Sequence, residues 1–125
     1  MKLAIPIKMN KEDSAIAPLF GKAKWFAIVK DDKIDIIPSG GQAVIEWLSE
    51  MKIDALLIQE MGVSPYAKAK ELELMIYHTG FERILLSEVL KKFKNNDLEI
   101  LDDTNMDEII KHHEKRHPRH ENGHH

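Results

Sequence analysis

Short apolar runs alternate with amphipathic segments along the first hundred residues, in an order that predicts an α/β domain. The apolar runs are typical of strands and lie at residues 2–7, 25–30, 33–37, 55–58 and 74–77. The second and third runs are separated only by Asp31-Asp32, which predicts an antiparallel hairpin. The later runs alternate with helical segments, which favours parallel pairing through right-handed crossovers. We therefore expect a mixed five-stranded sheet with helices on its faces and the hairpin at one edge.

The segments between these runs show the period of one-faced helices. We expect helices over residues 44–51, 64–72 and 79–95, and a short one from 104 onward. The second begins with Ser64 as N-cap and Pro65 at the first helical position. The third begins with the capping-box spacing of Thr79 to Glu82 and is ended by Asn95-Asn96.

This order of elements is that of a ribonuclease H-like sheet, so a nuclease is the first activity to consider. Two-metal phosphodiester hydrolysis needs converging carboxylates, one of them on the first strand. Residues 2–7 contain no Asp or Glu, and Glu46 and Glu60 offer only partial replacements. Phosphate-binding and dinucleotide-binding loop motifs are absent too. The sequence therefore predicts no nuclease.

Composition narrows the class further. The chain has 125 residues, of which 43% are apolar and 31% charged, with a net charge of -3; this is typical of one globular domain without nucleic-acid affinity. It has no cysteine, so His, Met, carboxylates or backbone would have to hold any metal. No apolar stretch is typical of a signal peptide or a membrane span, and we expect a cytoplasmic protein.

Two loop stretches carry short motifs whose order and spacing match one family. They are DSAIAPLFGKAKWF at residues 13–26 and QEMGVSPYA at residues 59–67, preceded by the strand KLAIPI and followed by Asn95-Asn96-Asp97-Leu98. In these residues the chain resembles the dinitrogenase iron-molybdenum cofactor biosynthesis family, the small proteins like NifX and the C-terminal domain of NifB, over residues 1–101. The resemblance implies a ribonuclease H-like fold that lacks nuclease chemistry. It also implies the binding of iron-sulfur or iron-molybdenum cluster precursors, exchanged with cluster-donor and cluster-acceptor proteins. Family members often have a histidine before the Phe-Gly pair, where this chain has Leu19.

The residues themselves also predict a pocket in these loops. In open sheets, ligands bind at the carboxyl ends of parallel strands. Glycines there let the backbone approach an anion, and Lys22 supplies positive charge. Simpler roles are open for each residue, such as shaping a turn, filling the core or carrying a solvated charge. The candidate binding residues are Asp13, Ser14, Phe20, Gly21, Lys22, Met61, Gly62 and His78.

The C-terminal residues 112–125, HHEKRHPRHENGHH, contain six of the seven histidines. No more than two of these histidines are consecutive, whereas a purification tag usually has an unbroken histidine run. We therefore interpret residues 112–125 as a native flexible tail that follows a domain of residues 1–111. Imidazole clusters favour nickel, copper or zinc. The alternative is a solvated end that binds no metal. The candidate metal ligands are His112, His113, His117 and His120.

Together these patterns predict a non-enzymatic carrier of a cluster precursor, with a divalent-metal site in the tail as a second function. One alternative is a small-anion-binding or regulatory module without a metal cluster. Another is an interaction protein that forms a homodimer through an exposed sheet edge or helix face.

Overall fold

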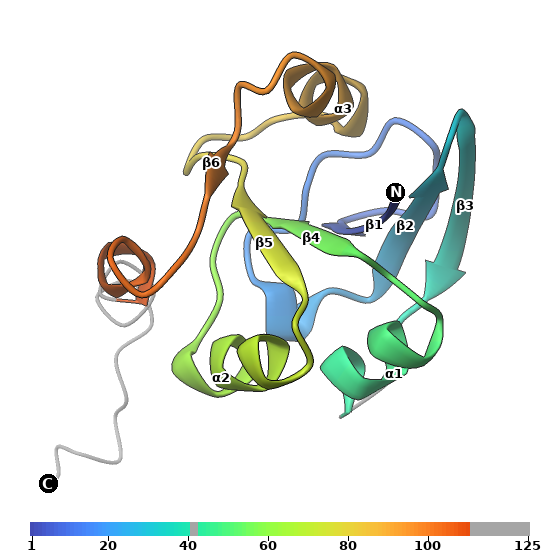
Figure 1. Ribbon diagram of the computed structural model, residues 1–125. Coiled ribbons are helices and arrows are strands. Elements are labelled where there is room, and N and C mark those ends of the chain that lie inside the picture. The colour runs from blue at the N-terminus through green and yellow to red at the C-terminus, as the bar shows by residue number, and fades with distance from the viewer. Residues whose placement is uncertain (41–42, 111–125) are drawn as a thin grey trace, which may run out of the picture.

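The structure is a computed structural model that describes residues 1–40 and 43–110, and it shows one mixed sheet between helices (Figure 1). The strand order is β3-β2-β1-β4-β5-β6, with β1, β4 and β5 parallel and the other pairings antiparallel. The strands are β1 Lys2–Ile7, β2 Trp25–Lys30, β3 Lys33–Pro38, β4 Ala55–Ile58, β5 Met75–His78 and β6 Glu99–Ile100. The helices are the short 3-10 turn η1 Phe20–Lys22, then α1 Val44–Glu50, α2 Val63–Glu71 and α3 Leu86–Lys94.

The sheet separates two apolar cores because successive strand residues point to opposite faces. On one face, Leu3, Ile5 and Ile7 of β1 pack in the core that includes Leu86 and Val89 of α3. On the other face, Ala4 belongs to the core formed with α1, α2 and the helical residues 106–110. Figure 1 shows α3 on one side of the sheet and α1 with α2 on the other. No helix within the described residues is long and apolar enough to cross a bilayer.

All five predicted strands are present, and the hairpin lies at the sheet edge as expected. The predicted count of five is nevertheless wrong, because the sheet has a sixth strand. β6 pairs antiparallel with β5, Ile100 opposite Tyr77 and Glu99 opposite His78. β6 has only two residues, and both are exposed, so it lacks the mostly apolar run of four or more residues that marks the other strands in the sequence.

The predicted starts of two helices are wrong. α2 begins at Val63 with Gly62 as its N-cap, so Ser64 lies inside the first turn. Pro65 is still accommodated there, since the first-turn N–H groups need no partner in the helix. α3 begins at Leu86, and its N-terminal bond runs from the Leu85 N–H to the Glu88 carboxylate at 3.0 Å. The end of α3 at Asn95 is as predicted.

Tertiary bonds explain the late start of α3. The Glu82 carbonyl accepts a bond from the Gln59 side chain at 2.8 Å, and the Ile84 carbonyl accepts one from the Ile16 N–H at 2.9 Å. These carbonyls are therefore used outside a helix. Gly80 has a φ of 96°, which also breaks the helical path.

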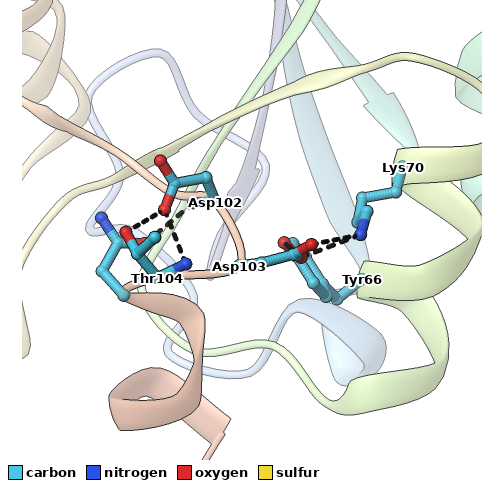
Figure 2. Close-up of polar contacts among 6 residues, drawn as sticks. Tyr66, Lys70, Asp102, Asp103 and Thr104 are labelled. Carbon is cyan, nitrogen blue, oxygen red and sulfur yellow. Dashed lines mark hydrogen bonds and ion pairs between the residues drawn. The ribbon is translucent and has the colours of Figure 1, made fainter.

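A polar network attaches the segment after β6 to α2 (Figure 2). The Tyr66 hydroxyl donates to Asp103 at 2.6 Å, and the Lys70 ammonium donates to both carboxylate oxygens of Asp103 at 2.8 and 2.7 Å. Burial raises the pKa of Tyr66 to about 12, with the Asp103 bond adding to the effect, and the Lys70 bond lowers the pKa of Asp103. Asp102 caps the turn that follows by accepting from the N–H and hydroxyl of Thr104. The network holds residues 101–110 beside α2, and Met106 and Ile109 of this segment are buried in the core.

Candidate functional site

The loop of residues 8–24 folds over the carboxyl ends of the parallel strands. It bonds to β1 through the Ala17 N–H and the Pro6 carbonyl, at 2.9 Å. It bonds to the residue after β4 in both directions: the Phe20 N–H donates to the Glu60 carbonyl, and the Glu60 N–H donates to the Pro18 carbonyl, each at 3.1 Å. The loop is thus held against two neighbouring strand ends.

The end of β5 joins the same region through Gln59. The His78 imidazole Nε2 lies 3.1 Å from the Gln59 carbonyl, and the Thr79 N–H donates to the Ile58 carbonyl at 2.9 Å. The His78 ring also meets the Phe81 ring edge-on, with centroids 4.7 Å apart. Because Gln59 contacts His78 and its neighbour Glu60 contacts Phe20, the loop of residues 8–24 and the segments after β4 and β5 meet at one end of the sheet.

Two hollows open at this end, on either side of η1. We call the first the lysine hollow; it is lined by Ile7, Lys8, Ala17, Pro18, Leu19, Lys22, Ala23 and Lys24. We call the second the helix cleft; it is lined by Phe20, Gly21, Val44, Ile45, Glu46, Ser64, Pro65 and Lys68. The first lies between β1, the loop and the start of β2, and the second lies between the loop and the first turns of α1 and α2.

Charge distinguishes the two hollows. The lysine hollow is lined by three lysines and no carboxylate. In the helix cleft, Lys68 lies 3.6 Å from Glu46, so its positive charge is largely offset. An anion is therefore attracted to the lysine hollow. Lys8, Lys22 and Lys24 are all exposed, so salt will screen this attraction within about 8 Å at physiological ionic strength.

The sequence model of the family described as "Dinitrogenase iron-molybdenum cofactor" matches residues 1–96. The chain belongs to this family. The resemblance carried by the two loop motifs is thereby confirmed, and with it an involvement in iron-molybdenum cofactor biosynthesis or binding at the level of the family. No curated protein matches the chain.

Several solved structures have the same fold, and three of them are described here. The orange protein of Desulfovibrio gigas, in its apo form, has a TM-score of 0.73 at 14% identity, covering 80% of this chain and 92% of its own. A Thermotoga protein named after NifB has a TM-score of 0.69 at 20% identity with the same coverage, 80% and 92%. A Methanocaldococcus jannaschii protein named as a dinitrogenase has a TM-score of 0.64 at 17% identity, covering 82% and 95%. These likenesses show the shared fold.

In this member of the cofactor family, three of the predicted residues line one of these two hollows. A fourth, Asp13, lines a separate hollow beside α3 with Ser87 and Lys91. Lys22 lines the lysine hollow, and Phe20 and Gly21 line the helix cleft. Phe20 is itself 2% exposed and belongs to the core, whereas the space beside Gly21 is open. Leu19, which precedes the Phe-Gly pair, also lines the lysine hollow.

The sequence analysis missed Lys8 and Lys24. Each looks like an ordinary surface charge in the sequence, and only the pairing of β1 with β2 brings them together. That ladder ends with Ile7 opposite Trp25, so the next residues outward are Lys8 and Lys24. The antiparallel register of the first two strands was the signal that could have identified Lys8 and Lys24 as neighbours.

Asp13 and Ser14 line neither hollow and connect the loop to its surroundings. The fully buried Ser14 hydroxyl accepts from the Met9 N–H and donates to the Ala15 carbonyl, both at 2.9 Å. The Asp13 carboxylate accepts from the Ser87 N–H at 2.9 Å in the first turn of α3, and this bond lowers the pKa of Asp13. Both placements are those of structural residues, and a binding role for either stays a prediction.

Met61, Gly62 and His78 also lie outside both hollows. Met61 is 1% exposed in the core, and Gly62 is the N-cap of α2. Among residues 1–40 and 43–110, no group of three or more His, Cys, Asp or Glu side chains could hold a metal ion. The tail candidates His112, His113, His117 and His120 lie outside the described residues.

Proposed function

We propose that the chain is a non-enzymatic carrier that holds an anionic iron-sulfur or iron-molybdenum cluster precursor in the lysine hollow. The observation that carries this proposal is the set of three lysines, without a carboxylate, around a hollow at the strand ends. Family membership supports the class of cargo. Cluster-donor and cluster-acceptor proteins, a cytoplasmic location and the ribonuclease H-like classification of the sheet are parts of the same proposal.

Retention by charge fits the residues present. A metal-sulfur anion whose metals already have their full set of ligands needs no further side-chain ligand. Leu19 adds an apolar wall, while Lys8, Lys22 and Lys24 surround it with ammonium groups. Such a site binds weakly and exchanges its cargo readily, which suits a protein that passes its ligand on.

We expect the full chain to bind tetrathiomolybdate, a coloured molybdenum-sulfur dianion, when gel filtration is run anaerobically at low salt in buffer that contains the anion. Replacing Lys8, Lys22 and Lys24 together by glutamine should weaken binding about tenfold or more, because three attractive charges are lost. Spectrophotometric titration measures the affinity, which should also fall as salt is added.

The matched control replaces Lys30, Lys91 and Lys92, three exposed lysines outside the hollow, by glutamine. It changes the net charge by the same amount and should leave binding nearly unchanged. Equal losses in the two triple variants would show that overall charge, and not the lysine hollow, binds the anion. Retention of citrate but not tetrathiomolybdate in the hollow would favour the alternative function, a small-anion-binding module.

The C-terminal histidines support a second proposal, a divalent-metal site. The observation is that six of the seven histidines lie in residues 112–125. Nickel titration should show binding to the full chain and its loss in a chain ending at Lys111. Replacing His112, His113, His117 and His120 by glutamine should remove most of the affinity. Bound metal should be released as the pH falls below about 6.5, because only neutral imidazole coordinates. Equal affinity in full and shortened chains would eliminate the tail as the site.

A further inference from the structure

The outer edge of β3 is the exposed long edge of the sheet. β3 ends the strand order, and within the described residues no strand pairs with its outer side. Figure 1 shows it at the margin of the molecule. The Ser39 N–H donates to the Lys24 carbonyl across the β2–β3 ladder at 2.9 Å. Since backbone groups of an antiparallel strand face alternate sides, those of Lys33, Asp35 and Ile37 also face β2. The N–H and carbonyl groups of Ile34 and Ile36 therefore point outward.

We propose that β3 pairs antiparallel with β3 of a second copy of this chain, about a two-fold axis at Ile34. The two sheets then become one continuous sheet. This interface lies at the sheet edge formed by β3 and is independent of the lysine hollow.

Backbone geometry leaves few registers for this pairing. Outward-facing residues of one copy must lie opposite outward-facing residues of the other. The choices are Ile34 with Ile34, Ile34 with Ile36, or Ile36 with Ile36. The last places Ile34 opposite Pro38, which has no N–H to donate. Two registers thus remain.

The charges on β3 decide between them. In the register centred on Ile34, Lys33 of each copy lies opposite Asp35 of the other copy. The interface therefore contains two such pairs of opposite charge. Their Cα atoms are about 4.5 Å apart, as in other non-hydrogen-bonded pairs. In the register that pairs Ile34 with Ile36, the two copies of Asp35 lie opposite each other instead. Like charges directly opposite are destabilising and opposite charges are stabilising. Both Lys33 and Asp35 are exposed in the single chain, so β3 is complementary to itself in the Ile34 register.

An apolar groove beside β3 supports the same arrangement. On the α3 face of the sheet, the half-buried Ile34 lines a groove with the apolar residues Met1, Leu3, Val29, Leu90 and Phe93 and the charged residues Asp31, Asp32 and Lys94. Pairing at Ile34 places Ile34 of the second copy beside Ile34 of the first, next to this groove. The contact removes apolar surface of both side chains from water. Edge lysines and prolines commonly prevent strand addition, but here Lys33 has a matching carboxylate on the second copy.

Light scattering of the full chain should give twice the 14.4 kDa mass of one chain at millimolar concentration. Lys33→Asp and Asp35→Lys should each give the single-chain mass, because each places like charges opposite each other. An equimolar mixture of these two variants should restore the double mass, since their edges are complementary. A single-chain mass for the wild type at this concentration would overturn the proposal, and so would an unchanged double mass for Lys33→Asp.

Cross-linking tests the register directly, because the chain has no cysteine of its own. Ile34→Cys places two thiols directly opposite, with Cα atoms about 5.5 Å apart, within disulfide range. Diamide should therefore link the Ile34→Cys chains into dimers. Ile36→Cys is the matched control and should stay unlinked, since the two cysteines are offset by four residues along the ladder. Linking of Ile36→Cys but not Ile34→Cys would refute the Ile34 register.

Discussion

Replacing Phe26 by alanine is expected to lower the free energy of unfolding by about 3–5 kcal/mol. Phe26 of β2 is fully buried. Its ring packs edge-on against Phe20, with centroids 5.7 Å apart, and against Trp47 of α1, at 5.9 Å. Its removal leaves a cavity where the sheet, α1 and the loop over the strand ends meet. Urea denaturation followed by circular dichroism measures the loss.

Phe93→Ala provides a comparison on the other face of the sheet. Phe93 is half-buried and packs against Tyr77, with centroids 5.1 Å apart, far from η1. We expect a smaller loss of stability there. Only Phe26→Ala should speed amide exchange in residues 19–24, because Phe20 anchors that segment to the core. A loss below about 1 kcal/mol for Phe26→Ala would show that the loop and α1 close the cavity without it.

Replacing Gly40 by alanine is expected to cost about 1–3 kcal/mol, the range typical of overpacking. A Cβ at Gly40 would overlap the indole of Trp47 near its attachment point, which cannot swing aside like the tip of a flexible chain. Either α1 or the Trp47 indole must therefore shift to make room for the new methyl group. Chemical denaturation measures the difference from the wild type.

Gly21→Ala is the matched control for this change. No atom lies within 4 Å of a Cβ built at Gly21, so we expect a change within about 0.5 kcal/mol. In a Trp47→Ala background the cost of Gly40→Ala should largely disappear, since the two sites are in contact. A persistent cost in that background would place the strain in the backbone rather than at the ring.

The strands were predictable because burial on one or both faces selects apolar residues in short runs. Glu99 and Ile100 of β6 are exposed and lack this signal. The start of α3 was misplaced because Phe81 continues the helical spacing of Leu85 and Val89 by chance. In the structure Phe81 is 39% exposed and contacts His78, outside α3. Bonds from residues distant in sequence decide that boundary, and a local pattern cannot contain them.

The end of the sheet that carries the candidate site was predictable, but the make-up of its positive hollow was not. Helix starts and glycines indicated where the parallel strands end. Lys8 and Lys24 gained a shared role only through the register of β1 against β2. Asp13 illustrates the opposite case, since a carboxylate in a polar loop suggests a ligand, whereas here it caps α3.

The loop over the strand ends is anchored in both cores. Ile16 is buried with α3 on one face of the sheet, and Phe20 is buried with α1 and α2 on the other. A segment clamped at two places cannot swing open as a flap about a single hinge. Any ligand of the lysine hollow must therefore enter and leave on its exposed side, where Lys22 and Lys24 lie.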